Sequence, residues 1–261
     1  MSIVPLPFRK VQRRSKYPIA RPGSRAQADE PRHETCRDLT THARITYDKP
    51  SGRLEKGRIM SPRRVDPALT ARRREALIKA GYAEILEKGL HATSIDSVVA
   101  RADFSKGGAL HYFRTKEDLL FAVLEWLLSE LTNSLDQMAS SEESPRARLA
   151  AELELLFHSA EVNRKLYLVL FDYVSVGTRS RRFQALFADF FAKCRARDRE
   201  IIAEGIVEQQ FRRVPPEEAA TTIRALVDGY CLQWLMEPGN LSVEVCRDRC
   251  RAVLGAYLLR A

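Results

Sequence analysis

The residues best suited to chemistry in this chain are cations and polar rings gathered between positions 94 and 116. Lys106 and Lys116 carry positive charge, while His111 and Tyr112 carry hydrogen-bonding groups on flat rings. The two glycines that follow Lys106 lack side chains, so the backbone there can approach a phosphate or a groove wall closely. Cations that meet phosphates and polar groups that meet base edges are what a protein needs to contact duplex DNA.

Two short helices would have to hold these side chains in place. Ser94 can cap a first helix, and Ser105 can cap a second one after a break at Asp103 and Phe104. The apolar positions of the first helix recur at helical spacing and are Ile95, Val98 and Val99. Two short helices joined by a tight turn form a helix-turn-helix, whose second helix can enter a major groove. The competing interpretation is a plain helical hairpin with a solvated lysine, but the agreement of caps, turn and polar residues favours the helix-turn-helix.

This stretch resembles the DNA-binding core of the TetR (tetracycline-repressor) family of bacterial transcription regulators. The residues that carry the resemblance are Ala102-Asp103-Phe104-Ser105-Lys106-Gly107, His111-Tyr112-Phe113 and Thr115-Lys116-Glu117-Asp118-Leu119-Leu120. The family usually has glycine where Asp103 stands and commonly an aromatic residue where Leu110 stands. The resemblance implies that DNA is contacted by Ser94, Ser105, Lys106, Gly107, Gly108, Leu110, His111, Tyr112 and Lys116.

Helices on either side complete the expected DNA-binding domain, called the reader from here on. A first helix over about 68–88 can be capped by Asp66 or by Thr70, and Gly89 is placed to end it. Its expected apolar stripe is Leu77, Ile78, Tyr82 and Ile85. Three arginines at its start, Arg72, Arg73 and Arg74, could equally form a solvated face or touch phosphates.

A long helix is expected to follow the helix-turn-helix. Thr115 and Asp118 have the spacing of a capping box, which places Lys116 at the N-terminus of that helix. Free N–H groups at a helix N-terminus favour an anion, so Lys116 is expected to contact a phosphate. Leucines continue at helical spacing to residue 135 and predict a rigid connection to the rest of the chain.

The net charge of +9 is unevenly distributed along the chain. Residues 1–59 carry 14 Lys and Arg against 6 Asp and Glu, and residues 60–116 carry 11 against 6. Residues 117–261 carry 18 against 22, so the basic charge surrounds the expected DNA contact. Residues 1–65 have no periodic pattern and are expected to be a disordered basic extension, unless Met60 is the true start of translation.

The remainder predicts an all-α protein with two structured domains. Helical periods are expected at about 145–160, 163–176, 180–210, 216–236 and 242–259, and no convincing strand pattern occurs. We therefore predict a three-helix helix-turn-helix domain over 66–131 and a larger helical domain over 132–261 for ligand binding and dimerisation.

Several classes of function lack support in the sequence. No nucleophile elbow, phosphate loop or HExxH motif is present, so no catalytic residue, metal ligand or cofactor is predicted. The five cysteines form no CxxC pair and indicate reduced thiols in a cytoplasm. No uninterrupted apolar stretch reaches the roughly 18 residues of a membrane span.

The resemblance also implies how the second domain works. Family members hold a ligand cavity between the fourth helix and the next three, and the candidate lining residues here are Trp126, His158, Tyr167 and Phe187. The last two helices pair with their copies in a homodimer, to which Leu254, Tyr257 and Leu258 could contribute an apolar face. A solitary domain could instead bury that face internally.

The sequence thus predicts a homodimeric regulator that reads a near-palindromic operator and is released from it by a small molecule. One alternative is a constitutive or architectural DNA-binding dimer that has no ligand response. Another is a small-molecule-binding enzyme that carries a vestigial reader domain.

Overall fold

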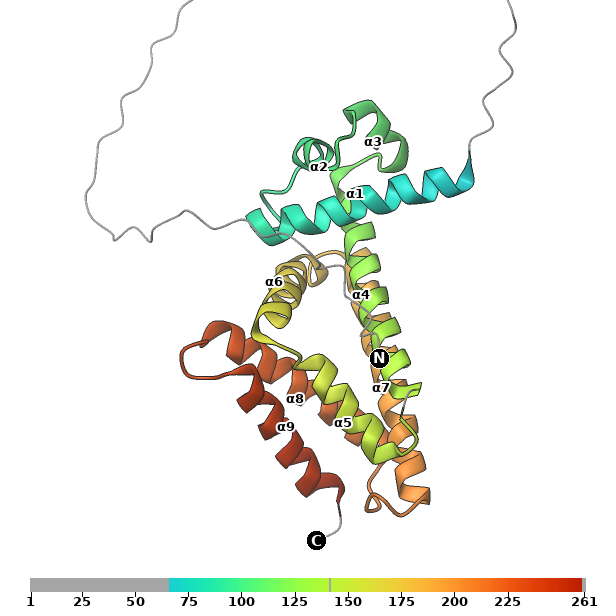
Figure 1. The fold of residues 1–261 in the computed structure, drawn as a ribbon, viewed down its shortest axis with the longest axis vertical. Helices are drawn as coiled ribbons and strands as arrows, with labels where there is room; N and C mark the ends of the chain where they lie inside the picture. The colour runs from blue at the N-terminus through green and yellow to red at the C-terminus, as the bar shows by residue number, and fades with distance from the viewer. Residues whose placement is uncertain (1–65, 141, 260–261) are drawn as a thin grey trace, which may run out of the picture. The chain divides into compact units, whose positions relative to one another are not determined.

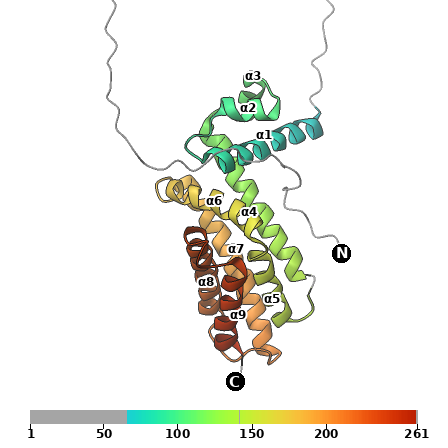
Figure 2. The same ribbon diagram turned by 60° about the vertical axis from the view of Figure 1, so that its left-hand side comes forward.

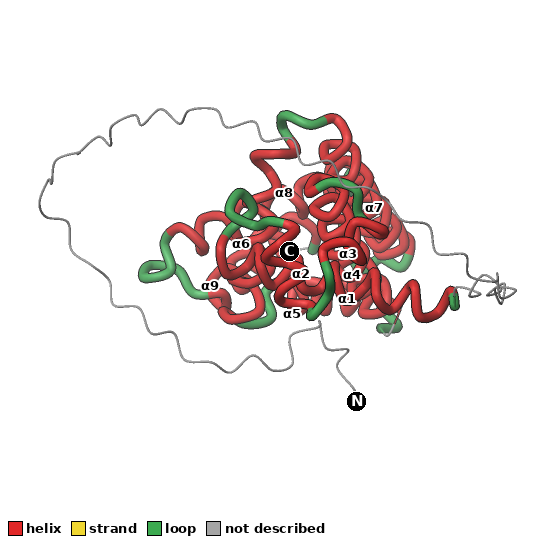
Figure 3. Tube along the Cα trace, turned by 90° about the horizontal axis from the view of Figure 1, so that it is seen from above, coloured by secondary structure: helices red, strands yellow, loops and turns green. Residues whose placement is uncertain are grey.

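The computed structural model describes residues 66–140 and 142–259, and this part of the chain is helical with no strand (Figures 1 and 3). The helices are α1 (Pro67–Lys88), α2 (Ile95–Ala102), α3 (Lys106–Tyr112), α4 (Lys116–Ser140), α5 (Pro145–Leu156), α6 (Ala160–Gly177), α7 (Arg181–Val207), α8 (Pro216–Met236) and α9 (Val243–Leu258). The predicted all-α class is confirmed. The N-terminal extension, the alternative start at Met60 and Cys36 lie outside the described residues.

Local sequence determines the ends of the first three helices. Asp66 caps α1 by accepting the Ala68 N–H at 2.9 Å, which decides between the two caps that the sequence allowed. Ser94 and Ser97 form a capping box at the start of α2, and Ser105 caps α3 by accepting the Gly108 N–H at 3.1 Å. The predicted apolar stripe of α1 is buried.

The turn between α2 and α3 contains a strained residue. Asp103 has φ 56° and ψ 46°, the left-handed conformation that glycine adopts without steric cost. Asp103→Gly is expected to raise the free energy of unfolding by about 0.5–1 kcal/mol, because relief of backbone strain exceeds the added freedom of the unfolded chain. Urea denaturation of the variant and the native chain measures this difference. A less stable variant would show that the Asp103 side chain contributes more than the strain removes.

Helix α4 connects the reader to the rest of the protein. Leu120, Leu124, Leu127, Leu131 and Leu135 are all buried along one side of it, as their spacing predicts. The helix continues without a break through residues 131 and 132, where the sequence placed the domain boundary. The expected domain boundary therefore lies inside this continuous helix.

The connection between α5 and α6 differs from the prediction. Helix α5 ends at Leu156 and α6 begins at Ala160, whereas the sequence predicted one helix to residue 160 and a break after it. The reason is Asn163, whose side chain accepts the N–H groups of His158 and Ser159 and donates to the Leu156 carbonyl. Helix α6 also continues to Gly177, and the next break falls at residues 178–180.

The regulatory part is a bundle of α4 to α9. Helices α7 and α8 pack against each other most extensively, α5 packs against α4, α7 and α9, and α8 lies beside α9 (Figures 1 and 2). The apolar residues expected at a dimer interface, Leu254 and Leu258, are buried inside this bundle, and Tyr257 is half-buried. That expectation was wrong for Leu254 and Leu258, because α9 turns them toward α5 and Phe211 within its own chain. For Tyr257 it stays a prediction.

Candidate nucleic-acid interface and regulatory core

Helix α3 presents one face to the exterior and one to the protein. Ala109 and Phe113 are buried against the rest of the reader, as the sequence predicted. Lys106, Gly107, Leu110 and His111 are exposed, and Gly108 and Tyr112 are half-buried. The His111 ring stands edge-on to the Tyr112 ring at 5.4 Å, so these two rings support each other at the end of the helix.

The exposed face of α3 is open to a partner. The Lys106 ammonium lies 2.9 Å from the Asp96 carboxylate, but both side chains are more than half exposed, so this pair holds the lysine only weakly. A Cβ on Gly107 would meet no other described atom within 4 Å, so packing inside the protein does not require glycine there. The missing side chain therefore leaves room for something outside the protein.

A hollow of about 400 Å³ lies beside α3. Its lining brings together four of the predicted contact residues: Ser105, Gly108, His111 and Tyr112. Arg73 of α1 lines the same hollow, whereas Arg74 lies over the Phe113 ring at 5.3 Å and so supports the core of the reader. The sequence could not separate these neighbouring arginines, because they differ only in the direction that α1 gives them.

Lys116 and Ser94 lie at helix starts and not on α3. Thr115 caps α4 by accepting the Asp118 N–H at 3.0 Å, which confirms the predicted cap. The Lys116 ammonium donates to the carbonyl of His91 at 2.9 Å and is thereby held over the turn between α1 and α2. Ser94 is half-buried, and its hydroxyl is engaged by the Ser97 N–H.

Hydrogen bonds and a ring contact join the reader to the regulatory helices. Asp172 of α6 accepts the Leu90 N–H at 3.0 Å, and the Tyr82 hydroxyl of α1 donates to the Lys165 carbonyl of α6 at 3.2 Å. Arg182 of α7 donates to Asp118 at 2.9 Å and lies 4.0 Å from the centre of the Phe121 ring. The hydrogen bond from Arg182 and the one from Thr115 lower the pKa of Asp118. These contacts link α6 to the C-terminal part of α1 and the turn that follows it, and α7 to the start of α4.

The four residues predicted to line a ligand cavity lie in different surroundings. Tyr167 is buried and stacks on Phe171 at 5.7 Å, whereas Trp126 packs edge-on against Tyr82 of α1. Phe187 stacks on Phe191 at 6.2 Å. His158 is exposed in the turn between α5 and α6, because Asn163 ends α5 before it. The structure thus leaves Tyr167 as the candidate nearest the centre of the bundle.

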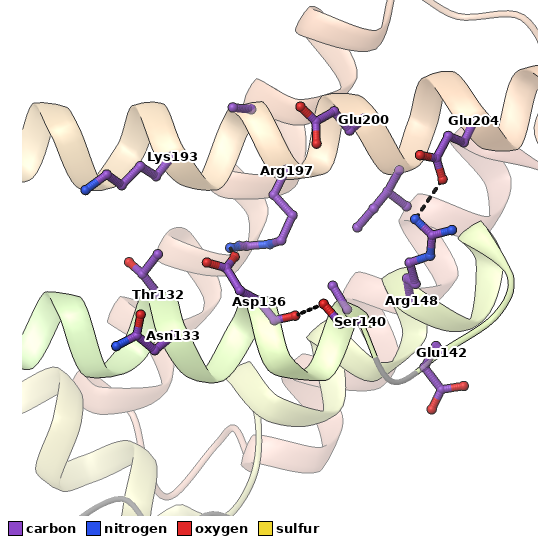
Figure 4. A pocket seen from close by; sticks show the side chains of 13 residues that line it. Thr132, Asn133, Asp136, Ser140, Glu142, Arg148, Lys193, Arg197, Glu200 and Glu204 are labelled. Carbon is purple, nitrogen blue, oxygen red and sulfur yellow. Dashed lines mark hydrogen bonds and ion pairs between the residues drawn. The ribbon is translucent and has the colours of Figure 1, made fainter.

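The larger pockets are lined by other residues. A groove of about 800 Å³ runs between α4 and α7, with polar side chains on both walls (Figure 4). Arg197 reaches from α7 across this groove to Asp136 of α4. Its Nη2 atom also lies 3.2 Å from the Oε1 atom of the buried Glu152. A smaller and mostly apolar pocket of about 250 Å³ lies between α5 and α9.

Charged side chains lie inside the regulatory bundle, and the sequence analysis did not predict their burial. Glu152, Asp198 and Arg224 are at most 5% exposed. Arg224 forms an ion pair with Asp228, one turn further along α8. Both carboxylate oxygens of Asp198, one oxygen of Glu152 and the Nε and Nη1 groups of Arg224 have no hydrogen-bond partner among the described residues. Buried groups of this kind call for a bound proton, a water molecule or a ligand.

A proton retained by Asp198 is the expected source of a partner for the two carboxyl groups. Burial raises the pKa of Asp198 well above its ordinary value of 3.8, and the neighbouring carboxylate of Glu152 raises it further. A protonated Asp198 can donate to the free oxygen of Glu152, which gives both groups a partner. Glu152 also forms an ion pair with Arg197.

This proton makes stability depend on pH. A carboxyl group whose pKa is raised by folding stabilises the native state below its unfolded pKa, and this contribution is lost as pH rises toward the folded pKa. Asp198→Asn keeps the donor to Glu152 and needs no proton. The variant should therefore gain stability relative to the native chain as pH rises above about 4, by up to about 1.4 kcal/mol per pH unit.

Urea denaturation of both proteins between pH 5 and pH 8 measures this difference. Asp248→Asn on the exposed face of α9 is the control, because its carboxylate is 60% exposed and should leave the pH slope unchanged. A difference in unfolding free energy that stays constant over this range would mean that Asp198 is ionised in the native protein.

The described residues contain no cluster of three or more histidine, cysteine or carboxylate side chains suited to a metal. Cys194, Cys231, Cys246 and Cys250 are buried free thiols, and burial raises the pKa of Cys250 to about 12. They pack as small apolar groups. No helix in the described part of the chain is long and apolar enough to cross a membrane.

Comparison with known proteins matches both parts of the chain. Residues 77–123 match the family described as bacterial regulatory proteins of the tetR family, and residues 145–259 match the C-terminal domain of BetI-type transcriptional repressors. The transcriptional regulator BetI of Pectobacterium atrosepticum is 30% identical over 178 residues, which cover 66% of this chain and 87% of that protein. BetI of Yersinia pestis is 40% identical over 93 residues, so this alignment spans about half (47%) of that relative.

Solved structures share the fold at lower identity. A transcriptional regulator from Saccharomonospora viridis in complex with choline has a TM-score of 0.69 at 19% identity, over 73% of this chain and 100% of that one. A TetR transcription regulator from Haloarcula marismortui has a TM-score of 0.67 at 23% identity with the same coverage.

Proposed function

Because this chain belongs to the TetR family of transcriptional regulators, with a regulatory domain of BetI type, we propose that it is a repressor that binds a near-palindromic operator as a homodimer. We further propose that a small-molecule ligand releases it from DNA and that it acts in the cytoplasm. The family consists of regulators, so the alternative of an enzyme with a vestigial reader is set aside.

The observation that carries the proposal is the outer face of α3. Two capped helices hold this face rigidly, its buried side is filled by Ala109 and Phe113, and its exposed side is polar and free of internal packing. We assign base contacts to Lys106, His111 and Tyr112, and an apolar contact to Leu110. Gly107 and Gly108 allow the backbone to approach the groove wall.

Phosphate contacts are assigned to residues at the helix starts. Lys116 uses one of its three N–H donors on His91 and keeps others for a phosphate oxygen. Ser94 and Ser105 stand at the N-termini of α2 and α3, where helix dipoles favour an anion. Arg73 joins this set because it lines the hollow beside α3.

The homodimer is assigned to an exposed stripe on α8 and α9, two helices that lie side by side (Figure 2). The stripe has the same helical spacing on both helices and consists of Ala225, Gly229, Leu232 and Met236 on α8 with Val245, Arg249, Ala252 and Ala256 on α9, all exposed except the half-buried Gly229. Small residues at these positions would let two copies of α8 approach closely, and the larger apolar ones would be covered by the partner.

The ligand is assigned to the regulatory core beside Tyr167. The choline that accompanies the S. viridis neighbour, and the aromatic side chains gathered here, favour a small organic cation. Trp126, Phe187 and His158 stay predictions as further contacts. Binding would shift α6 and α7, and the contacts of Asp172 and Arg182 would carry that shift to the reader. The competing proposal is a constitutive DNA-binding dimer without this response.

Selection from a pool of randomised duplex DNA tests the DNA-binding part of the proposal. The full chain should enrich an inverted repeat, and fluorescence anisotropy should show specific binding at least about 1000-fold tighter than binding to shuffled DNA. If no sequence is enriched, the protein binds DNA without sequence specificity. Addition of choline should dissociate the protein–operator complex if the protein is a ligand-released repressor. A constitutive dimer would stay bound to the operator.

A further inference from the structure

The pocket between α5 and α9 has an apolar floor. Its volume is about 250 Å³, and it lies where α5 begins and α9 ends. The floor is made by five buried side chains: Leu149, Leu153, Phe211, Leu254 and Leu258. Pockets that hold drug-sized molecules have volumes of about 300–1000 Å³, so this one suits a smaller ligand. A lining dominated by leucines suits an alkyl chain, because contact removes apolar surface of both from water.

Contacts of the loop between α7 and α8 hold this floor in shape. The Phe211 ring packs so closely on Gly205 that a Cβ at this glycine would clash with it. The Phe211 N–H also donates to the Gly205 carbonyl at 2.9 Å. The next N–H, that of Arg212, donates to the Leu258 carbonyl at 2.8 Å and ties the loop to the end of α9. The pocket is therefore formed in advance, so binding has to order few groups.

Two arginines carry the charge at the rim of the pocket. Arg146 and Arg251 are exposed, and no carboxylate is among the described residues that line this pocket. Arg251 is already paired with Glu154 at 2.5 Å and with Asp248 at 3.3 Å. The guanidinium of Arg146 forms no ion pair or hydrogen bond with a described residue, and only its backbone N–H is used, by the side chain of Gln210. One guanidinium therefore remains available to a ligand.

An apolar floor below one available guanidinium matches a molecule with an aliphatic body and a single negative charge. A guanidinium can form two parallel hydrogen bonds with a carboxylate. We propose that this pocket binds a small aliphatic monocarboxylate, whose alkyl chain lies on the leucines and whose carboxylate pairs with Arg146. The pocket shares no lining residue with the assigned ligand region beside Tyr167, so it is a second ligand site.

The pocket and the proposed dimer stripe use different sides of α9. On α9 the pocket is lined by Arg251, Leu254, Gly255 and Leu258. The stripe on the same helix consists of Val245, Arg249, Ala252 and Ala256. At 3.6 residues per turn these two sets point in different directions from the helix axis. The proposed homodimer should therefore leave the pocket accessible.

Two probes with the same alkyl chain test the assignment. Octanoate and 1-octanol differ in the head group, and only octanoate carries a negative charge at pH 7. Calorimetric titration of the native full-length protein should show octanoate binding at least about tenfold more tightly than 1-octanol, because only the carboxylate forms charged hydrogen bonds with Arg146.

Variants of Arg146 assign this preference to its charge. Arg146→Gln removes the charge and should reduce the preference for octanoate to about twofold or less. Arg146→Lys keeps the charge and should retain most of the preference. Arg164→Gln is the matched control, because Arg164 is an exposed arginine of α6 that does not line this pocket. The control should keep the full preference of the native protein.

Gly255→Leu tests whether the alkyl chain lies in this pocket. A Cβ at Gly255 would meet one side chain within 4 Å, that of Leu259 at 3.8 Å, and leucine is a better helix former than glycine, so the variant should fold. The added side chain should fill the pocket and weaken the binding of both probes at least about tenfold. Gly239→Leu, in the loop beyond α8, is the control and should bind both probes as the native protein does.

Equal affinities of the native protein for octanoate and 1-octanol would overturn the assignment, and so would a failure to bind octanoate. An unchanged preference in Arg146→Gln would overturn the role of the guanidinium. Octanoate binding of native strength in Gly255→Leu would place the ligand elsewhere and would overturn the assignment as well. None of these titrations contains operator DNA, so their failure leaves the proposed function intact.

Discussion

Replacing Gly229 by arginine is expected to split the homodimer and to weaken operator binding at least about 100-fold. Gly229 is half-buried in the middle of the stripe on α8, and a Cβ there would meet no side chain or neighbouring helix within 4 Å. The substitution should therefore leave the protomer folded, because arginine is also a better helix former than glycine. A long charged side chain at the centre of the interface would keep the two copies apart.

The size of the expected effect follows from bivalency. A dimer that engages two half-sites gains about 10²–10⁴-fold over one reader domain that binds alone. Analytical ultracentrifugation measures the dimer, and fluorescence anisotropy measures operator affinity. Gly239→Arg is the matched control, because a Cβ at Gly239 also meets nothing within 4 Å but lies in the loop beyond α8. A Gly229→Arg protein that remains a dimer would place the interface elsewhere.

The second large effect is expected at Gly107. Gly107→Glu introduces a side chain and a negative charge on the outer face of α3, where the protein itself leaves space. Like charges in contact across an interface cost several kcal/mol, so operator affinity should fall by at least about 100-fold. The fold should be retained, since glutamate in the first turn of a helix is favourable.

Gly239→Glu provides the control for the added charge, and it should bind the operator almost as the native protein does. Gly107→Ala adds only a methyl group and should cause an intermediate loss. Circular dichroism and thermal unfolding of each variant check that the helices persist. Unchanged operator affinity in Gly107→Glu would show that α3 does not face the DNA.

The reader was predictable because its structure is determined by neighbouring residues. The caps at Ser94, Ser105 and Thr115 lie within three residues of the N–H groups they satisfy, so the sequence alone located the starts of three helices. The inward direction of Ala109 and Phe113 followed from helical spacing in the same way. Neither inference needed knowledge of distant contacts.

The regulatory domain was less predictable because side-chain contacts that the apolar periodicity does not show decide its structure. Asn163 ends α5 early through bonds to His158 and Leu156, which nothing in the local pattern indicates. Leu254 looked like part of a dimer face but packs inside its own bundle. Arg224 and Asp198 stand on helices where charged residues are usually solvated, so only the packing of α7 against α8 reveals them as buried.

The side-chain contacts between the two domains could not be predicted from the sequence either. Asp172 and Leu90 are 82 residues apart, and Arg182 and Asp118 are 64 residues apart. Each of these residues reads in the sequence as an ordinary surface or cap position. Their pairing connects α6 to the turn after α1 and α7 to the start of α4, so the proposed ligand response has a physical route through named contacts.

The central claim is that one protein couples a ligand to release from DNA, and reciprocity tests it most directly. If choline weakens operator binding by some factor, saturating operator must weaken choline binding by the same factor. Calorimetric titration of the full-length protein with choline, in the absence and in the presence of saturating operator duplex, measures both sides of this coupling. The account predicts choline affinities that differ about 5–150-fold and match the loss of operator affinity. Equal choline affinities in the two titrations would contradict it.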